Sequence, residues 1–292
     1  MISNEKLQQP VAMVTGAAGG IGSSVSARLA SRGYIVAMVD INSAGLEKLH
    51  EELGSVHLAC LADVTDYLQV KRTVDDIVSK TGRIDVLVNN AGMVITEPYE
   101  ECSVDKLCSE NALNYLAPLY CIKAVLSHMQ EAGEGCIISI CSIASIMPLS
   151  ASPGYSASKA ALRSLSLSLN LHLKKYGIHV GCVCPSAVDT RSLQVEALEG
   201  GSVLNFLNEP LLPDTVAEAV LKVIDKKKME ICIPFHEGLS SKLGGFFPSI
   251  LPVVLPRLEK SGERNRLKFL EKKNLKPVPN REGDPNERLQ RN

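Results

Sequence analysis

The chain has 292 residues, of which 45% are hydrophobic, and its formal net charge is −1. This length and apolar content allow a full core in one large α/β domain. A net charge so close to zero creates no global field that would attract nucleic acid, so a nucleic-acid partner is not expected.

The chain begins with the pattern strand, glycine turn, helix, strand, from Val11 to Asp40. An apolar run leads into Gly-Ala-Ala-Gly-Gly-Ile-Gly, helical composition follows over Ser23 to Ser31, and Tyr34 to Val39 has the composition of a second buried strand. Gly16 and Gly20 permit a tight turn and close backbone approach, and Gly22 permits close helix packing. The helix N-terminus could then offer amides to a pyrophosphate, although a plain tight turn explains Gly16 alone equally well.

Asp40 follows the second strand roughly 20 residues beyond the glycines, where a carboxylate can accept hydrogen bonds from ribose hydroxyls. The same carboxylate would repel a 2′-phosphate. No basic residue stands nearby to neutralise such a phosphate, at Ala17, Ala18, Ile41 or Asn42. We therefore expect NAD rather than NADP, the alternative for Asp40 being a turn former at a strand end.

Apolar strands and helical stretches alternate through the rest of the chain. The further strands are expected at Val56 to Leu61, Ile84 to Asn89, Cys136 to Ile140, Ile178 to Val183 and Met229 to Ile233. This alternation predicts a doubly wound parallel sheet of about seven strands.

Tyr155 and Lys159 are four residues apart in a helical stretch, so their side chains share one face. A cation beside a phenol lowers the phenol pKa from its usual value of about 10. Such a tyrosine can exchange a proton with an alcohol or a carbonyl oxygen. The spacing alone is common on exposed helices, and it gains meaning from the glycine turn.

Together these motifs resemble the short-chain dehydrogenase/reductase family, from about Val11 to Pro234. The matching segments are Thr15-Gly16-Ala-Ala-Gly-Gly20-Ile21-Gly22, Asp63-Val64, Asn89-Asn90-Ala91-Gly92, Ser142, Tyr155-Ser-Ala-Ser-Lys159 and Pro185 to Thr190. The resemblance implies a single Rossmann-fold domain. It also implies an NAD(P)-dependent oxidoreductase that interconverts an alcohol and a ketone by hydride transfer.

The resemblance implies a role for each reacting group. Tyr155 would be the general acid/base, and Lys159 would hold the nicotinamide ribose and, with the positive nicotinamide ring, lower the Tyr155 pKa. Ser142, thirteen residues before Tyr155, would donate a hydrogen bond to the substrate oxygen. The family's water-holding asparagine is assigned to Asn114, with Asn111 as the alternative.

The resemblance also implies a cofactor groove at the carboxyl ends of the strands. Asp63 and Val64 would contact adenine, and Thr190 the nicotinamide carboxamide. The full expected set is Thr15, Gly16, Gly20, Ile21, Gly22, Asp40, Asp63, Val64, Asn90, Ala91, Gly92, Tyr155, Lys159, Pro185, Val188 and Thr190. Ser186 stands where the family usually has glycine, and a positive φ there would cost about 1–2 kcal/mol.

Nine cysteines are present without a C-x-x-C pair, and the six histidines have no metal-ligand spacing, so no metal is expected. Cys182 and Cys184 should lie on the same side of one strand as small hydrophobes. An odd cysteine count without a signal peptide favours a reducing, intracellular and cytoplasmic location. Cys141, next to Ser142, is an expected oxidation-sensitive neighbour of the site.

The region from about 186 to 212 is expected to form a mobile flap over the substrate. Its apolar residues are Leu193, Val195, Leu198, Val203, Leu204, Phe206 and Leu207. They indicate a lipophilic substrate, such as a steroid, a retinoid or another lipid-like molecule, unless they merely pack the flap against the core.

An apolar stretch, Leu239 to Leu258, follows the strands and contains Pro248, Pro252 and Pro256, which argue against a membrane-spanning helix. Next, Arg257 to Lys276 holds eight basic and three acidic residues, a local charge of +5. This pattern suits a peripheral membrane contact. A subunit interface or a cover of the substrate pocket is slightly favoured over it.

The expected organisation is a tail over 1–10, a dehydrogenase domain over 11–235, an apolar and basic extension over 236–276, and a disordered tail over 277–292. The expected assembly is a homodimer or homotetramer. The alternative to an oxidoreductase is a catalytically quiet dinucleotide-binding protein used for sensing or assembly, which has no chemical reason to keep Ser142, Tyr155 and Lys159 together.

Overall fold

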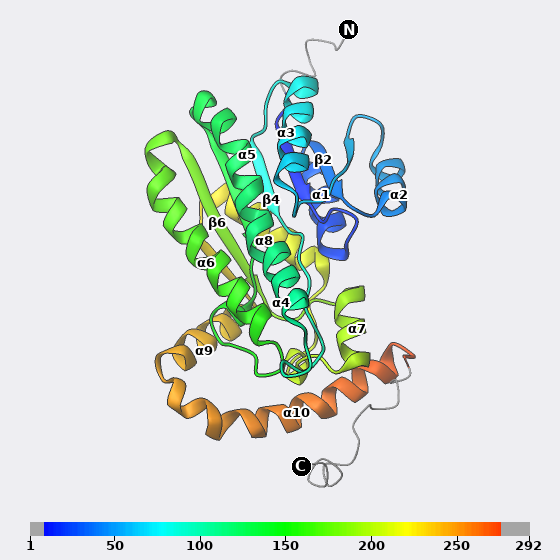
Figure 1. The fold of residues 1–292 in the computed structure, drawn as a ribbon, viewed down its shortest axis with the longest axis vertical. Helices are drawn as coiled ribbons and strands as arrows, with labels where there is room; N and C mark the ends of the chain where they lie inside the picture. The colour runs from blue at the N-terminus through cyan, green and yellow to red at the C-terminus, as the bar shows by residue number, and fades with distance from the viewer. Residues whose placement is uncertain (1–8, 276–292) are drawn as a thin grey trace.

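A seven-stranded sheet organises the computed structural model, which describes residues 9–275 (Figure 1). The strand order is β3-β2-β1-β4-β5-β6-β7, and every neighbouring pair is parallel. The strands are β1 (Val11–Thr15), β2 (Ile35–Asp40), β3 (Leu58–Leu61), β4 (Val86–Asn89), β5 (Gly135–Ile140), β6 (Ile178–Pro185) and β7 (Glu230–Ile233). The predicted single-domain, doubly wound Rossmann fold is confirmed.

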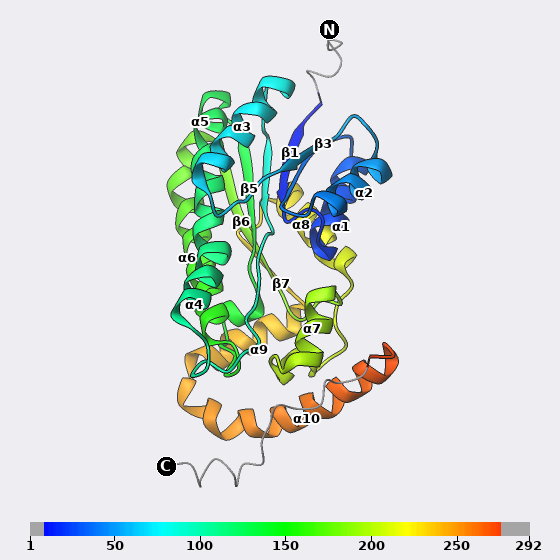
Figure 2. The same cartoon turned by 45° about the vertical axis from the view of Figure 1, so that its right-hand side comes forward.

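Helices cover both faces of the sheet (Figure 2). The α-helices are α1 (Gly20–Ser31), α2 (Ser43–Leu53), α3 (Tyr67–Thr81), α4 (Val104–Asn111), α5 (Ala117–Ala132), α6 (Pro153–Leu173), α7 (Arg191–Glu199), α8 (Pro213–Lys226), α9 (Phe235–Phe246) and α10 (Leu251–Lys272). Helices α1, α2 and α8 enclose one core with the sheet, and α3 and α5 help to enclose the second core on the opposite face.

Strand β1 shows why the sheet needs both layers of helices. All five of its residues are buried. Ala12 and Val14 point into the core beneath α1 and α8, whereas Val11 and Met13 point into the core beneath α3 and α5. Side chains alternate along a strand, so a continuous apolar run is the pattern of a parallel strand covered on both faces.

Several strand boundaries differ by a few residues from those expected. β3 begins at Leu58 rather than Val56, because the imidazole Nδ1 of His57, at 3.1 Å, accepts the hydrogen bond of the Val36 N–H and so replaces a strand pairing. β6 extends beyond Val183 to Pro185, where it is paired with Ile233 of β7.

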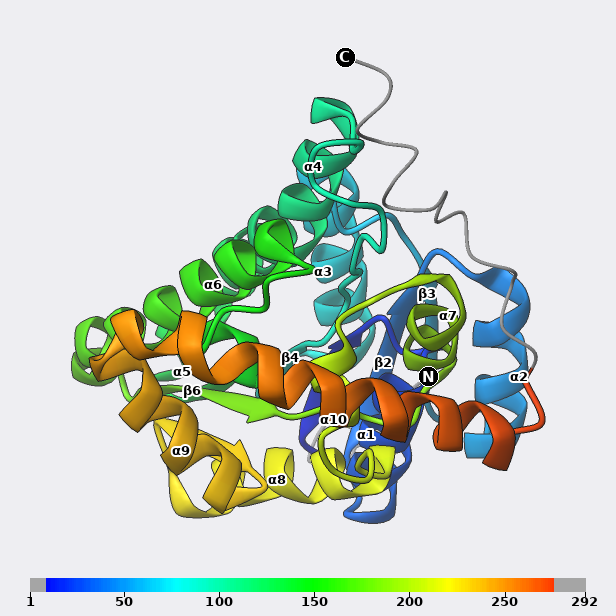
Figure 3. The same cartoon turned by 90° about the horizontal axis from the view of Figure 1, so that it is seen from below.

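The C-terminal helices lie across the carboxyl end of the sheet (Figure 3). Pro248 marks the break between α9 and α10, but Pro252 lies in the first turn of α10 and Pro256 lies inside it, so only one of the three prolines separates helices. Within residues 9–275 no single helix is long and apolar enough to cross a membrane. Helix α9 and the segment Pro248–Lys272 meet that criterion only as a pair bent by 96°.

Residues 1–8 and 276–292 lie outside the described part of the chain. The expectations of an N-terminal tail over 1–10 and of a disordered tail over 277–292 therefore fall almost entirely on residues that the structure does not describe.

Candidate active site

Helix α6 carries Tyr155 and Lys159 to the end of strand β5. The ammonium of Lys159 is buried and donates a hydrogen bond to the carbonyl oxygen of Ile140, the last residue of β5, at 3.0 Å. Lys159 Nζ lies 5.8 Å from the centre of the Tyr155 ring. Pro153 is the first residue of α6, where a backbone N–H would have no partner within the helix, so proline is tolerated there. The helix therefore begins two residues before Tyr155.

Ser142 lies just beyond β5 and caps a short 3₁₀ turn, where its Oγ accepts a hydrogen bond from the Ala144 N–H at 3.1 Å. The Ser142 hydroxyl also acts as a hydrogen-bond partner of Tyr155. Strand β5 and helix α6 thus bring Ser142, Tyr155 and Lys159 together, although thirteen residues separate the serine from the tyrosine.

Burial dominates the electrostatics of this group. It raises the pKa of Tyr155 above its usual value, and the hydrogen bond with Ser142 lowers that pKa by a smaller amount. Burial also lowers the pKa of Lys159. Without a cofactor, desolvation is the largest influence on the Tyr155 pKa, and Lys159 lies 5.8 Å from the ring and is bonded to Ile140. The expected lowering of this pKa by Lys159 and the nicotinamide ring together stays a prediction.

Asn114, rather than Asn111, lies beside this group. A π-helical turn, Ala112–Leu116, joins α4 to α5, and Asn114 is fully buried within it, while Asn111 is exposed. The Asn114 Oδ1 accepts from the Met93 N–H at 2.9 Å, and its Nδ2 donates to the Met93 carbonyl at 2.9 Å and to Ser158 Oγ at 3.2 Å. The π-turn is a local distortion of the helix at this asparagine.

Gly92 lets the loop after β4 lie close to the side chains of Asn114 and Lys159. A Cβ at Gly92 would lie 3.0 Å from Asn114 Oδ1 and 3.2 Å from Lys159 Nζ. Any side chain here would crowd the space between the asparagine and the lysine.

The glycine turn is packed as the sequence suggested. Gly16 has a φ of +63°, which favours glycine. A Cβ at Gly22 would lie 2.1 Å from the Gly16 carbonyl oxygen, so α1 can approach the turn only with glycine there. Gly19 caps α1 without any side-chain hydrogen bond, and Gly20 is the first residue of the helix.

Hydrogen bonds connect the glycine turn to the end of β4 through Thr15, Asn90 and Ala91. Thr15 Oγ1 accepts hydrogen bonds from the N–H groups of Asn90 and Ala91, at 3.0 and 3.1 Å. Asn90 Nδ2 donates to the carbonyl oxygens of Thr15 and Gly16, at 2.9 and 3.0 Å. The side chains of Thr15 and Asn90 therefore join the end of β4 to the glycine turn.

The carboxylates of Asp40 and Asp63, at the strand ends, accept hydrogen bonds from neighbouring backbone N–H groups. Asp40 accepts from the N–H groups of Ala18 and Asn42, at 2.9 and 3.0 Å. Asp63 Oδ1 accepts from the N–H and the hydroxyl of Thr65, at 2.8 and 2.7 Å. The Val64 side chain is buried in the core next to α3, so only its backbone is left for a ligand.

The loop after β6 carries no strain at Ser186. Among the described residues, positive φ angles outside glycine occur only at Lys227 and Asn274, so the cost foreseen for serine does not arise. The Ser186 N–H donates to the Ile233 carbonyl at 2.8 Å. Thr190 caps α7 through a 3.4 Å hydrogen bond from the Leu193 N–H, and its methyl group would lie 3.1 Å from a Cβ at Gly20.

A cavity of about 680 Å³ joins these groups. Ser142, Tyr155 and Lys159 line it together with six other expected cofactor-site residues: Ile21, Asn90, Gly92, Pro185, Val188 and Thr190. The other residues of the expected cofactor set do not line it: Thr15, Gly16, Gly20, Gly22, Asp40, Asp63, Val64 and Ala91.

The region expected to form a flap, α7 and the 3₁₀ turn Val203–Phe206, serves two purposes. Leu193, Leu204 and Leu207 line the cavity. Phe206 packs instead against Phe269 of α10, with 5.3 Å between ring centres. This segment thus holds residues that line the cavity and a residue that packs against α10, and a substrate in contact with the former stays a prediction.

The C-terminal extension supplies an apolar wall of the same cavity. The wall residues are Leu243, Phe247, Ile250, Leu251, Val254, Leu255 and Leu258. Of the three roles considered for this segment, the structure shows the cover of the pocket.

Glu196 is a cavity residue that the sequence reasoning missed. It lies on α7, three residues after Leu193, so the two share the cavity-facing side of the helix. Burial raises its pKa to about 7, although a hydrogen bond from Asn205 Nδ2, at 2.9 Å, acts in the opposite direction. Its position three residues after Leu193 in a helical stretch was the signal that could have identified it.

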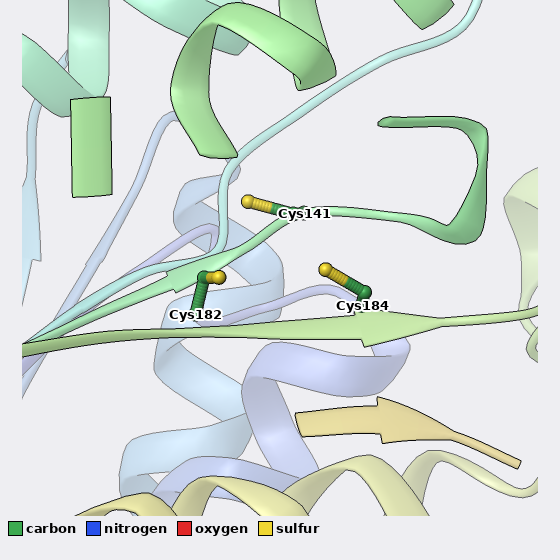
Figure 4. A group of neighbouring side chains, drawn as sticks. All are labelled: Cys141, Cys182 and Cys184. Carbon is green, nitrogen blue, oxygen red and sulfur yellow. The ribbon is translucent and has the colours of Figure 1, made fainter. Parts of the chain in front are cut away.

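Three thiols meet beside the site (Figure 4). The sulfur atoms of Cys141, Cys182 and Cys184 all lie within 4.8 Å of one another and are buried. Cys182 and Cys184 lie on the same side of β6, as expected, and Cys141 reaches them from the end of β5. The pKa of each thiol is raised, by burial foremost for Cys141, so at neutral pH they are protonated and pack against Leu162. The expected oxidation sensitivity of Cys141 finds no support, because thiolate is the reactive form.

Comparisons with known proteins agree with this geometry. The family profile described as short chain dehydrogenase matches residues 10–199. D-threitol dehydrogenase of Mycolicibacterium smegmatis is 35% identical over 188 residues, covering 63% of this chain and 72% of that protein. 3-Ketodihydrosphingosine reductase of Bacteroides thetaiotaomicron is 31% identical over 232 residues, covering 80% of this chain and 82% of that protein.

A solved structure shows the same arrangement of the chain. The 3-ketoacyl-(acyl-carrier-protein) reductase of Brucella melitensis, complexed with NADH, superposes with a TM-score of 0.71 at 25% identity. The match covers 78% of this chain and 97% of that one. The profile match, the relatives and the parallel sheet together lead to one conclusion: this chain belongs to the short-chain dehydrogenase family and is an oxidoreductase of that family.

Proposed function

We propose that the protein is an NAD-preferring oxidoreductase that interconverts a lipophilic secondary alcohol and its ketone. The observation that carries this proposal is the cavity of about 680 Å³ that has Ser142, Tyr155 and Lys159 on one wall and the apolar residues of α9 and α10 on another. A hydroxyl, a phenol and an ammonium on a mostly apolar cavity suit a substrate with one reacting oxygen and a hydrocarbon body.

The chain has a place for a dinucleotide. Helix α1 begins without a side-chain cap, so the amides of its first turn are free to bind a pyrophosphate beside Gly16 and Gly22. Asp40 would accept from the ribose hydroxyls, and Ile21 and Thr190 line the way to Tyr155. A bound nicotinamide cofactor supplies or accepts the hydride.

The protein's own groups would handle the proton and the substrate oxygen. Tyr155 donates its phenolic proton to a carbonyl oxygen in reduction and takes the alcohol proton in oxidation. Ser142 donates a hydrogen bond that orients this oxygen. Lys159 would hold the nicotinamide ribose and keep a positive charge next to the phenol. Asn114 holds the backbone of Met93 and so the loop that carries Gly92, in reach of Lys159.

The names of two relatives point to different substrate classes. D-threitol dehydrogenase is named for a polar substrate, and 3-ketodihydrosphingosine reductase is named for a lipid-like one. The apolar lining by Leu193, Leu204 and the C-terminal helices favours the lipid-like class for this chain, such as a steroid, a retinoid or another lipid. A homodimer or homotetramer and a location inside the cell are part of the same proposal.

A cofactor and substrate screen tests the proposal. Purified protein is assayed with NAD(H) and NADP(H) against alcohols and ketones of graded size and polarity. We expect turnover with NAD(H) on large apolar substrates. Turnover only of small polyols would overturn the substrate class, and binding of NAD without turnover of any substrate would favour the catalytically quiet alternative.

A further inference from the structure

Exposed apolar side chains gather on the outer face of α9 and on the bend into α10. Phe235, Leu239, Leu243 and Phe246 recur every three or four residues, so they form one stripe along α9. Phe246 is 76% exposed, and Val253, in the first turn of α10, is 66% exposed. We call these residues, together with Phe247 and Ile250, the apolar rim. A contiguous patch of this kind marks an interaction surface.

The apolar rim is continuous with the mouth of the cavity. Leu243, Phe247 and Ile250 belong both to the rim and to the cavity lining, whereas Phe246 and Val253 are exposed and do not line the cavity. An apolar molecule held against the rim would therefore reach the cavity along side chains of the same kind. Figure 3 shows α9 turning into α10, which runs across the molecule, and the two helices are bent by 96° to one another.

The outer face of α10 changes from apolar to basic along its length. Val253 is followed by Arg257, Lys260, Arg264 and Lys268, all exposed and spaced three or four residues apart, so they lie in one line. No carboxylate of residues 9–275 forms an ion pair with any of these four cations. Among the acidic residues of α10, Glu259 accepts a hydrogen bond from Ser150 and Glu263 pairs with Arg266, while Glu271 lies one turn beyond Lys268.

We propose that the apolar rim and this basic line dock the protein on an anionic lipid surface, from which the substrate enters the cavity. This inference rests on the proposed function, because it takes the substrate to be lipophilic. An apolar stripe beside a line of basic residues suits a helix lying in the plane of a membrane interface. A two-fold contact between copies would bring two such basic lines close together, and their repulsion disfavours it.

Vesicle binding of the full chain tests the docking without any turnover. Flotation is measured with phosphatidylcholine vesicles and with vesicles that also contain phosphatidylserine. We expect binding to the anionic vesicles that weakens at high salt. Each basic residue near such a surface strengthens binding about fivefold, so Lys260→Gln with Arg264→Gln should weaken it about 25-fold.

The apolar part is tested by Phe246→Ser with Val253→Ser, which leaves the cavity lining unchanged. The matched control is Leu171→Ser, which replaces a 73% exposed leucine of α6 on another part of the surface. The double variant should lose at least tenfold in vesicle binding and in activity on vesicle-embedded substrate, and it should keep its activity on a small water-soluble ketone. The control should keep all three.

The outcomes separate this inference from the function on which it rests. Failure of the unaltered protein to bind anionic vesicles overturns the docking even if the enzyme is active. Vesicle binding by a protein that turns over no alcohol or ketone overturns the function and leaves the docking standing. A dimer in sedimentation that Phe246→Ser with Val253→Ser converts to monomers, without vesicle binding, assigns the rim to a second copy of the chain.

Discussion

The carboxylate of Asp40 accepts a hydrogen bond from the backbone N–H of Ala18, with 2.9 Å between Oδ2 and the nitrogen. Its other oxygen accepts from the Asn42 N–H at 3.0 Å. The residue assigned to cofactor choice therefore also joins the end of β2 to the glycine turn. A substitution can remove its charge and keep one of these two hydrogen bonds.

Replacing Asp40 by asparagine should relax the preference for NAD. The single amide oxygen keeps an acceptor for the Ala18 N–H and gives up the one for the Asn42 N–H, and the substitution removes the charge that repels a 2′-phosphate. We expect the ratio of kcat/KM for NADP to that for NAD to rise at least tenfold, with the free energy of unfolding lowered by about 1–2 kcal/mol through the lost hydrogen bond to the Asn42 N–H. Asp40→Ala, which also loses the acceptor, should be less stable than Asp40→Asn. Equal use of both cofactors by the unaltered enzyme would refute the role of Asp40.

Tyr155→Phe should bind NAD and lose turnover. Removal of the phenolic hydroxyl removes the proton donor, and the ring still fills its place, so we expect kcat to fall about 10²–10⁴-fold with little change in the Kd for NAD. Cofactor binding is followed by fluorescence titration and turnover by NADH absorbance. An unchanged kcat would remove Tyr155 from the mechanism.

Alcohol oxidation should accelerate as the pH rises. Because burial raises the pKa of Tyr155, the phenol stays protonated at neutral pH, and the fraction of phenolate grows with pH. Reduction of a ketone uses the protonated phenol and should change little over the same range. Profiles of kcat/KM in both directions test this expectation, and an oxidation rate that does not depend on pH from 6 to 9 would contradict it.

Glu196→Gln should stabilise the protein at alkaline pH and not at acidic pH. The carboxyl of Glu196 has a folded-state pKa of about 7 against an ordinary 4.5, so the unfolded chain loses this proton first as the pH rises. Stability is thus lost between these two values, and the glutamine variant should gain about 1–3 kcal/mol above pH 7 and nothing near pH 4. Urea unfolding at several pH values measures the difference. Glu199→Gln, an exposed position on the same helix, is the control and should give no such pH dependence.

Gly22→Ala should damage the glycine turn. The added Cβ would lie 2.1 Å from the Gly16 carbonyl oxygen and 2.8 Å from Ala17 Cα, both of them backbone atoms that cannot yield cheaply. We expect a loss of about 1–3 kcal/mol in stability together with weaker NAD binding. Gly244→Ala lies within α9, and its nearest neighbour would be the Met147 sulfur at 3.8 Å, so it should unfold at the same denaturant concentration as the unaltered protein or a slightly higher one.

Local periodicity explains why the sheet and the reacting pair could be predicted. Apolar runs separated by helical stretches can bury themselves in few ways, and a parallel sheet with helices on both faces is one of them. The spacing of Tyr155 and Lys159 places them on one side of a helix for the same reason. The strand ends were less exact, since a side chain such as His57 can take over a backbone hydrogen bond.

Contacts between segments far apart in the sequence could not be predicted from local periodicity. Cys141 joins Cys182 and Cys184 only because β5 and β6 are neighbours, and Glu196 faces the cavity only because α7 folds back over Tyr155. The C-terminal helices could have covered a pocket or a partner, and packing placed them along the cavity.

The sequence by itself determined the family, the parallel sheet, the glycine turn and the face shared by Tyr155 and Lys159, because these depend on short-range spacing. Only the tertiary structure decided between Asn111 and Asn114, raised the pKa of Tyr155 and made α9 and α10 a cavity wall. The reason is physical: desolvation and side-chain contact depend on which remote residues surround a group, and no local pattern records them.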